Sequence, residues 1–135
     1  VTAVPLGISP VFRPRSAGDL SAALAHYDLK PGSYGLCVST LEPRKKIDRL
    51  LSAWRRLPVL TRDNFPLVLI GASGWRNESL KAAIEAGSAE GWLRCLGYVP
   101  ESDLPCLYAG SRLFAYPSTY EGFGFPPLEA MASSV

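Results

Sequence analysis

Two glutamates stand eight residues apart near the carboxyl end of the sequence, on either side of a glycine-rich turn. Glu121 precedes Gly122 and Gly124, and Glu129 follows two prolines that fix φ for the first turn of a helix. The glycines lack a Cβ, so their N–H groups can approach a ligand closely, and a helix N-terminus favours anions. A carboxylate can accept hydrogen bonds from two vicinal hydroxyls. The segment therefore suits a ligand with a polyol at both ends and a phosphate in the middle, as in a nucleotide sugar.

A basic pair, Arg44 and Lys45, follows an apolar run over residues 34–40 that is typical of a buried strand. Positive side chains and a helix N-terminus can together stabilise the charge that forms on a departing phosphate. The sequence contains no Asp-x-Asp motif to hold a divalent metal. We therefore expect a metal-independent phosphate site, with no cofactor, made by this pair and the turn at residues 122–127. The plainer alternative is a solvated charge pair preceding a helix.

Other candidate residues also have two interpretations. A glutamate before or early in a helix can simply cap it or complement its dipole, which applies to both carboxylates of the turn. Glu101 could accept hydrogen bonds from the N1 and N2 donors of guanine, or could be an ordinary N-terminal helix charge beside Ser102. Trp75 could wall a ligand crevice or pack at the surface. His26, the single histidine, has no carboxylate or cysteine partner in the sequence, so we assign it no catalysis.

Apolar and amphipathic segments alternate from residue 34 onward, the pattern of βα units around a parallel sheet. Strands are expected over residues 34–40, 67–70, 92–96 and 113–116, and helices over residues 19–27, 47–57, 78–90, 102–109 and 127–132. Ligands bind such sheets at the carboxyl ends of the strands. The loops at residues 40–46, 71–75, 97–100 and 117–125 should therefore converge on one crevice. Residues 1–33 are expected to form an initial strand and a covering segment.

Composition indicates one globular domain over residues 1–135, with 47% hydrophobic and 19% charged residues. The net charge of +2 is too small to argue for nucleic acid as a partner. No apolar run approaches the length that spans a bilayer. Cys37, Cys95 and Cys106 are odd in number and lack C-x-x-C spacing, so we expect buried thiols in a reducing compartment and a cytoplasmic protein.

Several segments together resemble one enzyme family. Residues 121–132, E-G-F-G-F-P-P-L-E-A-M-A, and residues 38–46, V-S-T-L-E-P-R-K-K, are similar to E-G-F-G-x-P-x-x-E-A-M-A and T-L-E-P-R-K-N of the retaining GT-B glycosyltransferases of group 1, or family 4. Further similarities follow in the family's order at residues 4–8, 67–75 and 96–109. Lys46 departs from the family, where Asn or Gly often follows, and Thr40 stands where some members have an Arg.

The resemblance implies an α/β fold with a Rossmann-like three-layer parallel sheet, the C-terminal half of a GT-B architecture. Family members continue beyond the position of Val135 and carry a separate N-terminal acceptor domain. We therefore expect a fragment, truncated at its C-terminus, that contains part of the donor site and is inactive alone.

The resemblance also assigns roles within the site. It places Arg44 and Lys45 on the diphosphate, and Glu129 on the ribose hydroxyls. Glu121 would contact the transferred sugar and its reaction face, so that Glu121, Lys45 and Arg44 are the expected catalytic residues. The expected donor-binding residues are Thr40, Tyr98, Val99, Gly122, Phe123, Gly124, Phe125 and Glu129. Within this set the base is bound largely by backbone groups near residues 98–100, and the two phenylalanines are expected to shape the loop by packing.

The T-L-E-P-R-K subtype is most similar to mannosyl- and related transferases of bacterial surface polysaccharide assembly. The expected donor is thus GDP- or UDP-linked, with GDP-mannose first, and the acceptor is a glycan or a lipid-linked sugar. Peripheral membrane association of the full-length enzyme, at the inner face of the membrane, is a further expectation. Two alternatives stay open. One is a nucleotide-binding module without transferase activity, and the other is a GT-B nucleotide-sugar epimerase, against which the E-G-F-G-F-P-P-L-E spacing argues.

Overall fold

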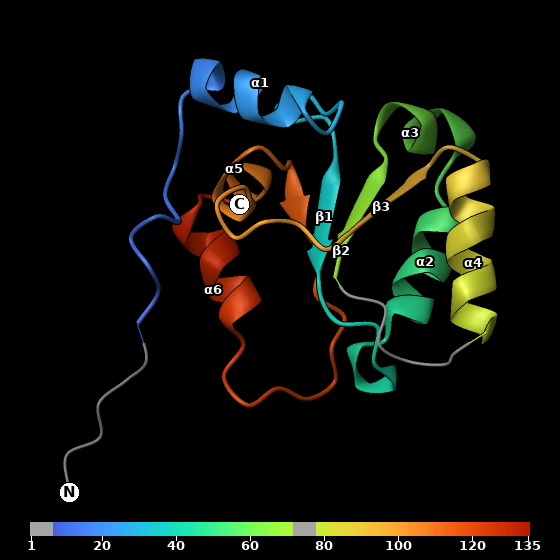
Figure 1. Ribbon diagram of the computed structural model, residues 1–135. Helices are drawn as coiled ribbons and strands as arrows, with labels where there is room; N and C mark the ends of the chain where they lie inside the picture. Colours follow the sequence, from blue (N-terminus) through green and yellow to red (C-terminus); the bar gives the residue numbers. More distant parts are fainter. Residues whose placement is uncertain (1–6, 72–77) are drawn as a thin grey trace, which may run out of the picture.

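The structure, a computed structural model, describes residues 7–71 and 78–135 (Figure 1). Within these residues, four parallel strands form one sheet in the order β3-β2-β1-β4. The strands are β1 (Gly35–Val38), β2 (Leu67–Ile70), β3 (Leu93–Gly97) and β4 (Leu113–Phe114). The helices are α1 (Ala17–Ala25), the 3-10 turn η1 (Pro43–Lys45), α2 (Ile47–Arg55), α3 (Val59–Asn64), α4 (Glu78–Ala89), α5 (Leu104–Ala109) and α6 (Phe125–Ala132).

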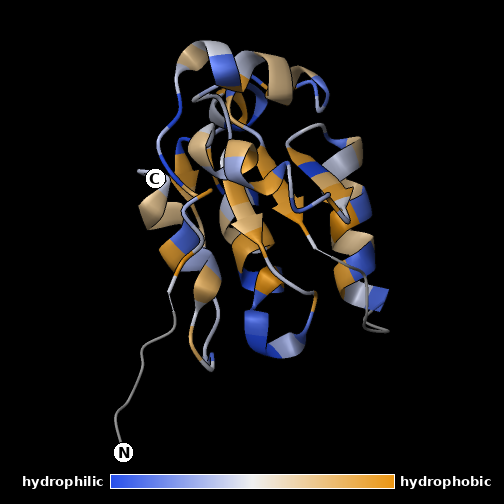
Figure 2. Cartoon of the chain, turned by 60° about the vertical axis from the view of Figure 1, so that its left-hand side comes forward, coloured by the Kyte–Doolittle hydropathy of each residue, from blue (hydrophilic) through white to orange (hydrophobic). Residues whose placement is uncertain are grey.

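Helices cover both faces of the sheet, so the strands are apolar on both sides. Leu36 and Val68 belong to a buried cluster that includes residues of α1, α5 and α6. Cys37 and Leu69, one position further along each strand, belong to a second cluster with residues of α2 and α4. This alternation follows from the two-residue period of a strand. Figure 2 shows hydrophobic residues concentrated in the central sheet and polar residues toward the outer helices. The expected α/β fold with a three-layer parallel sheet is confirmed.

The strand order reverses direction between β1 and β4. The chain passes from β1 to β2 and then to β3 on one side, and afterwards returns to place β4 on the other side of β1. In open α/β sheets, the two loops that leave neighbouring strands at such a reversal diverge and leave a crevice at the carboxyl ends. The loops after β1 and β4 therefore border the position at which this fold binds ligands.

Gly71 allows the end of β2 to lie tightly against the end of β1. A Cβ on this residue would stand 1.8 Å from the carbonyl oxygen of Ser39, and its φ is +155°. Its N–H donates to the carbonyl of Gly97, and Ser39 N–H donates to Ile70. Only glycine meets both the conformation and the close approach. The tight contact fixes where the loop after β1 leaves the sheet.

The structure differs from the sequence-based expectation between residues 55 and 65. The helix expected over residues 47–57 ends at Arg55, and a separate helix, α3, follows over Val59–Asn64. None of the residues of α3 is buried, so the segment has no apolar stripe that sequence periodicity could reveal. Pro58 stands at the N-cap of α3 as well as beyond the end of α2.

The expectation of three buried thiols was wrong. Cys37 is buried, Cys106 is half-buried, and Cys95 is exposed. Cys95 lies on β3, an edge strand of the described sheet, where no further strand covers the outer side. The apolar neighbours of Cys95 in the sequence indicated burial that the edge position does not provide. The expected contributions of Trp75 and residues 72–75 to the crevice, and most of the similarity at residues 4–8, lie outside the described residues.

Candidate functional site

The loop after β1 turns tightly and presents two cations in opposite ways. Pro43 starts the 3-10 turn η1, and Lys46 ends it in the left-handed conformation with φ of +52°. Within this turn the Lys45 side chain is directed inward and is only 9% exposed, whereas the Arg44 side chain is 42% exposed. The local geometry thus gives one nearly buried cation and one accessible cation beside it.

The loop after β4 is fastened to this turn by hydrogen bonds to one carbonyl group. The backbone N–H and the hydroxyl of Thr119 donate to the carbonyl oxygen of Arg44 at 3.0 and 3.1 Å. The hydroxyl of Ser118 donates to the same oxygen at 3.4 Å. The two loops that border the strand reversal are therefore joined at their backbones.

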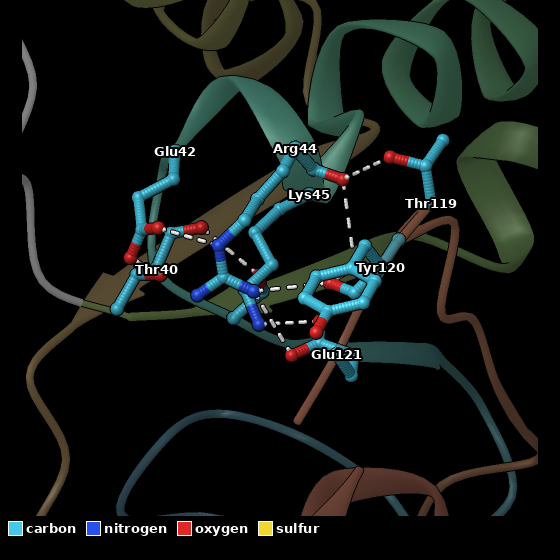
Figure 3. Close-up of polar contacts among 9 residues, drawn as sticks. Thr40, Glu42, Arg44, Lys45, Thr119, Tyr120 and Glu121 are labelled. Carbon is cyan, nitrogen blue, oxygen red and sulfur yellow. Dashed lines mark hydrogen bonds and ion pairs between the residues drawn. The ribbon is translucent and has the colours of Figure 1, made fainter. Parts of the chain in front are cut away.

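Glu121, from the loop after β4, binds both cations of the loop after β1 (Figure 3). Its Oε1 accepts from Lys45 Nζ at 2.5 Å, and its Oε2 accepts from Arg44 Nη1 at 3.0 Å. Arg44 Nη1 also donates to the carbonyl oxygen of Tyr120 at 3.1 Å. Three residues expected to act together are thus brought together, in an ionic cluster that joins the loops after β1 and β4.

Charges and burial in the cluster strongly favour the ionised carboxylate. Partial burial alone would raise the pKa of Glu121, but hydrogen bonds from Lys45 and from neighbouring hydroxyl and guanidinium groups outweigh it and lower this pKa to about 2. Lys45 Nζ also lies 5.6 Å from the ring centroid of Tyr116, within the range of a cation–π contact. The nearly buried ammonium is therefore compensated by a carboxylate and an aromatic face.

Glu42 is a site residue that the sequence analysis did not single out. It accepts from Arg44 Nε at 2.8 Å and from the Thr40 hydroxyl at 2.7 Å. Hydrogen bonds from Thr40 and Arg44 lower the pKa of this carboxyl group. Thr40, an expected donor-binding residue, therefore supports Glu42, and Glu42 orients the guanidinium. The sequence signal that could have indicated this role was a carboxylate two residues before an arginine in the same loop.

Glu129 contributes to a different part of the site. It lines a cavity of about 290 Å³ together with Ser9, Val11, Phe12, Glu101 and Leu104. These residues come from the N-terminal segment, the loop after β3 and α5, and not from η1. Burial and the nearby Glu129 carboxylate raise the pKa of the Tyr108 hydroxyl. The two glutamates of the E-x7-E segment therefore face separate regions, as an extended ligand would require.

The turn between the glutamates begins helix α6. Gly124 is the N-cap with φ of +84°, and the helix starts at Phe125, one residue before the first of the two prolines. The rings of Phe123 and Phe125 pack on each other with centroids 4.9 Å apart, while both residues remain partly exposed. Gly122 is exposed, and an added Cβ there would meet no atom within 4 Å. The turn is thus open to solvent on its outer side.

The two candidate base-binding residues after β3 have opposite environments. Tyr98 is 79% exposed and Val99 is 4% exposed. Val99 belongs to the apolar cluster beneath α1, α5 and α6, so only its backbone can meet a ligand. Among the described residues, no group of three or more His, Cys, Asp or Glu side chains is arranged to hold a metal ion. Within the same ranges, no helix has the length and apolar character needed to cross a membrane.

Comparison with known proteins identifies the class to which this fold and site belong. The profile of the family described as "Glycosyl transferases group 1" matches residues 30–135. The chain belongs to this glycosyltransferase family, as the resemblance of its motifs implied. It is 48% identical over 130 residues to O-antigen chain mannosyltransferase B of Escherichia coli, an alignment that covers 96% of this chain and 34% of that protein. The chain thus spans about a third of the length of this relative.

Solved structures show the same fold at lower sequence identity. WaaG, a glycosyltransferase involved in lipopolysaccharide biosynthesis, superposes with a TM-score of 0.79 at 22% identity, over 97% of this chain and 35% of WaaG. Anabaena Alr3699/HepE in complex with UDP and glucose superposes with a TM-score of 0.75 at 23% identity, over 94% of this chain and 34% of HepE. The described sheet and helices correspond to the Rossmann-like C-terminal domain of GT-B glycosyltransferases.

Proposed function

We propose that this chain is the nucleotide-sugar-binding part of a retaining, metal-independent glycosyltransferase that transfers a hexosyl group. The observation that carries the proposal is the ionic cluster of Arg44, Lys45 and Glu121 between the loops after β1 and β4, at the strand reversal. A crevice at a strand reversal is the ligand position of this fold class. Two cations at that point suit the diphosphate of a donor.

The cluster supplies the electrostatic part of the reaction. Cleavage of a sugar–diphosphate bond leaves negative charge on the phosphate, and fixed positive groups stabilise that charge as it develops. Lys45 is nearly buried, so its contact with a phosphate oxygen is little screened by solvent. Arg44 adds the N–H donors of its planar guanidinium group, which match the oxygens of a phosphate. The N-terminus of α6, with N-cap Gly124, adds the positive end of a helix dipole on the same loop.

The cavity that Glu129 lines is assigned to the nucleoside. The Glu129 carboxylate can accept hydrogen bonds from the vicinal ribose hydroxyls, and Glu101 in the same cavity can accept hydrogen bonds from the N1 and N2 donors of guanine. GDP is therefore our first choice of nucleotide. The mannosyltransferase name of the Escherichia coli relative supports GDP-mannose as the donor, and the HepE complex supports a nucleoside diphosphate in this fold.

Glu121 is assigned to the transferred sugar, where its carboxylate would face the hydroxyls and the reaction centre. In the complete enzyme, the acceptor would be a glycan or lipid-linked sugar of surface polysaccharide synthesis, held by a separate acceptor domain. We place this enzyme in the cytoplasm, with peripheral contact to the inner face of the membrane. The name of the Escherichia coli relative, an O-antigen chain mannosyltransferase, supports this acceptor class.

Calorimetric titration with GDP, UDP and ADP, with and without a chelator, tests the donor site. We expect GDP to bind most tightly and the chelator to have no effect. Turnover is measured with the full-length protein and GDP-mannose. Mannosyl transfer with retention at the anomeric carbon would support the proposal. Binding without turnover would favour a nucleotide-binding module, and epimerised nucleotide sugar would favour the epimerase.

A further inference from the structure

Both cations assigned to the donor phosphates already have a carboxylate partner. Glu121 binds Lys45 through one oxygen and Arg44 through the other, and Glu42 binds the Nε of Arg44. Two positive and two negative side chains therefore sum to zero charge. A diphosphate cannot be attracted to such a cluster by net charge, since the nearest carboxylates would repel it.

The two carboxylates are held in different ways. Glu42 stands in the same short loop as Arg44 and also accepts from Thr40, so local chain geometry keeps it on the guanidinium. Glu121 comes from a loop 76 residues further along and is followed by Gly122, around which an added Cβ would meet nothing. Glu121 is the carboxylate that bridges both cations, so it is the one that a diphosphate bound to both of them would meet.

The turn that carries both cations is held by contacts of its own. The Lys45 side chain, 9% exposed, belongs to a 3-10 turn and lies over the ring of Tyr116. The carbonyl oxygen of Arg44 accepts from Thr119, which ties the turn to the loop after β4. A phosphate that binds Lys45 Nζ and Arg44 Nη1 through the N–H donors that Glu121 now occupies must therefore take the place of its carboxylate.

We infer that Glu121 is an internal anion that occupies the position of the donor diphosphate on Arg44 and Lys45 and competes with it. Donor binding exchanges one anion for the other. The exchange leaves Glu121 without its cations, and the hydroxyls of the transferred sugar then become its hydrogen-bond donors. A nucleotide without a sugar leaves this carboxylate uncompensated, so the competition also favours the complete donor over its product. This inference rests on the proposed phosphate role of Arg44 and Lys45.

The test is a calorimetric titration with inorganic pyrophosphate, which has the phosphates but neither the base nor the sugar. Glu121→Gln removes the competing charge and keeps the shape of the side chain. We expect this variant to bind pyrophosphate about 3- to 30-fold more tightly than the unaltered protein, the range for one partly screened charge-assisted contact. If Glu121 instead supports the phosphate site, Glu121→Gln should bind pyrophosphate more weakly than the unaltered protein.

The chain offers a matched control. Glu90 also binds two arginines, Arg55 and Arg62, and accepts from Trp92 Nε1. It stands directly after α4, away from the loops after β1 and β4. Glu90→Gln removes the same charge from a similar ion pair and should leave pyrophosphate affinity within about twofold at physiological salt. If both variants gained the same pyrophosphate affinity, the change in net charge would explain the gain, and the inference would be overturned.

Lys45→Ala separates this inference from the function on which it rests. We expect Lys45→Ala to weaken pyrophosphate binding, and the gain from Glu121→Gln to shrink in the double variant, because the two residues act through one contact. If Lys45→Ala weakens binding but Glu121→Gln does not tighten it, the competition is refuted and the phosphate site stands. If Lys45→Ala leaves pyrophosphate binding unchanged, both the competition and the phosphate site are refuted.

A crystal structure of the unaltered protein saturated with pyrophosphate gives a second measurement that needs no variant. The expected result is a phosphate oxygen on Lys45 Nζ and the Glu121 carboxylate turned away from it. A structure in which pyrophosphate is bound while Glu121 keeps both cations would overturn the exchange.

Discussion

Replacement of Lys45 by alanine should weaken the binding of GDP through loss of one contact to the diphosphate. A charge-assisted hydrogen bond contributes about 1.5–3 kcal/mol. The 9% exposure of this side chain argues against strong solvent screening. Lys45 must give up Glu121 before it meets a phosphate, however, so the net loss should lie in the lower part of the range. We expect about 1.5–2 kcal/mol, roughly a 10- to 30-fold increase in Kd.

The assay is isothermal titration calorimetry of the unaltered protein and the variant with GDP. Lys45→Met serves as a second variant, because it removes the charge while it retains most of the buried volume. Lys81→Ala removes one positive charge from the exposed surface of α4 and controls for net charge. Thermal unfolding of each protein shows that it is folded at the temperature of the titration.

The two Lys45 variants should agree, and Lys81→Ala should bind like the unaltered protein. If both Lys45 variants bind GDP with unchanged affinity while folded, the ammonium does not meet the phosphates. Loss of GDP binding on addition of a chelator would refute the argument from another side, because a metal would then supply the positive charge.

Three further predictions concern separate parts of the chain. Glu129→Gln should weaken GDP binding by about 1 kcal/mol. Glu121→Gln should lower the turnover of the full-length enzyme without weakening GDP binding, so equal losses of GDP affinity in titrations would show the assignment to be wrong. Gly71→Ala should lower the free energy of unfolding in urea by more than about 3 kcal/mol, because the added Cβ would overlap the Ser39 carbonyl. Gly18→Ala within α1 serves as the control and should not destabilise the protein. A mild effect of Gly71→Ala would refute the close approach. The pKa of Glu121 is lowered to about 2, so its contribution to stability is present above its unfolded pKa of about 4.3 and is lost as the pH falls toward 2. The free energies of unfolding in urea of the unaltered protein and of Glu121→Gln should therefore converge between these pH values. A difference that stays constant with pH would contradict the ion pairs.

Local pattern was sufficient for most of the elements. The apolar runs at residues 34–40 and 67–70 contain β1 and β2, and the amphipathic stretch at residues 78–90 contains α4. The expectation failed where burial is not local. Helix α3 has no buried face to create a period, and Cys95 lies on an edge strand whose position depends on the order of the sheet. Neither fact is encoded in the residues nearby.

The sequence by itself determined the class of fold and the family, and it predicted the residue types of the candidate site. Glycines before a pair of prolines specify a turn that enters a helix, and a basic pair after a buried strand specifies charge at a carboxyl end. These are properties of a few consecutive residues. They indicated that Arg44, Lys45 and Glu121 belong to one crevice, without showing how they meet.

Only the tertiary structure decided which side chains touch. Glu121 and Lys45 are 76 residues apart in the chain, and they meet because β4 returns to pair with β1 instead of extending the sheet beyond β3. The same reversal directs Glu129 toward the segment at residues 9–12 and Glu101. Strand order depends on the packing of both apolar faces at once, a property of the whole domain. The pairing of the two cations with Glu121, and the separation of the two glutamates, therefore follow from the three-dimensional arrangement and not from motif spacing.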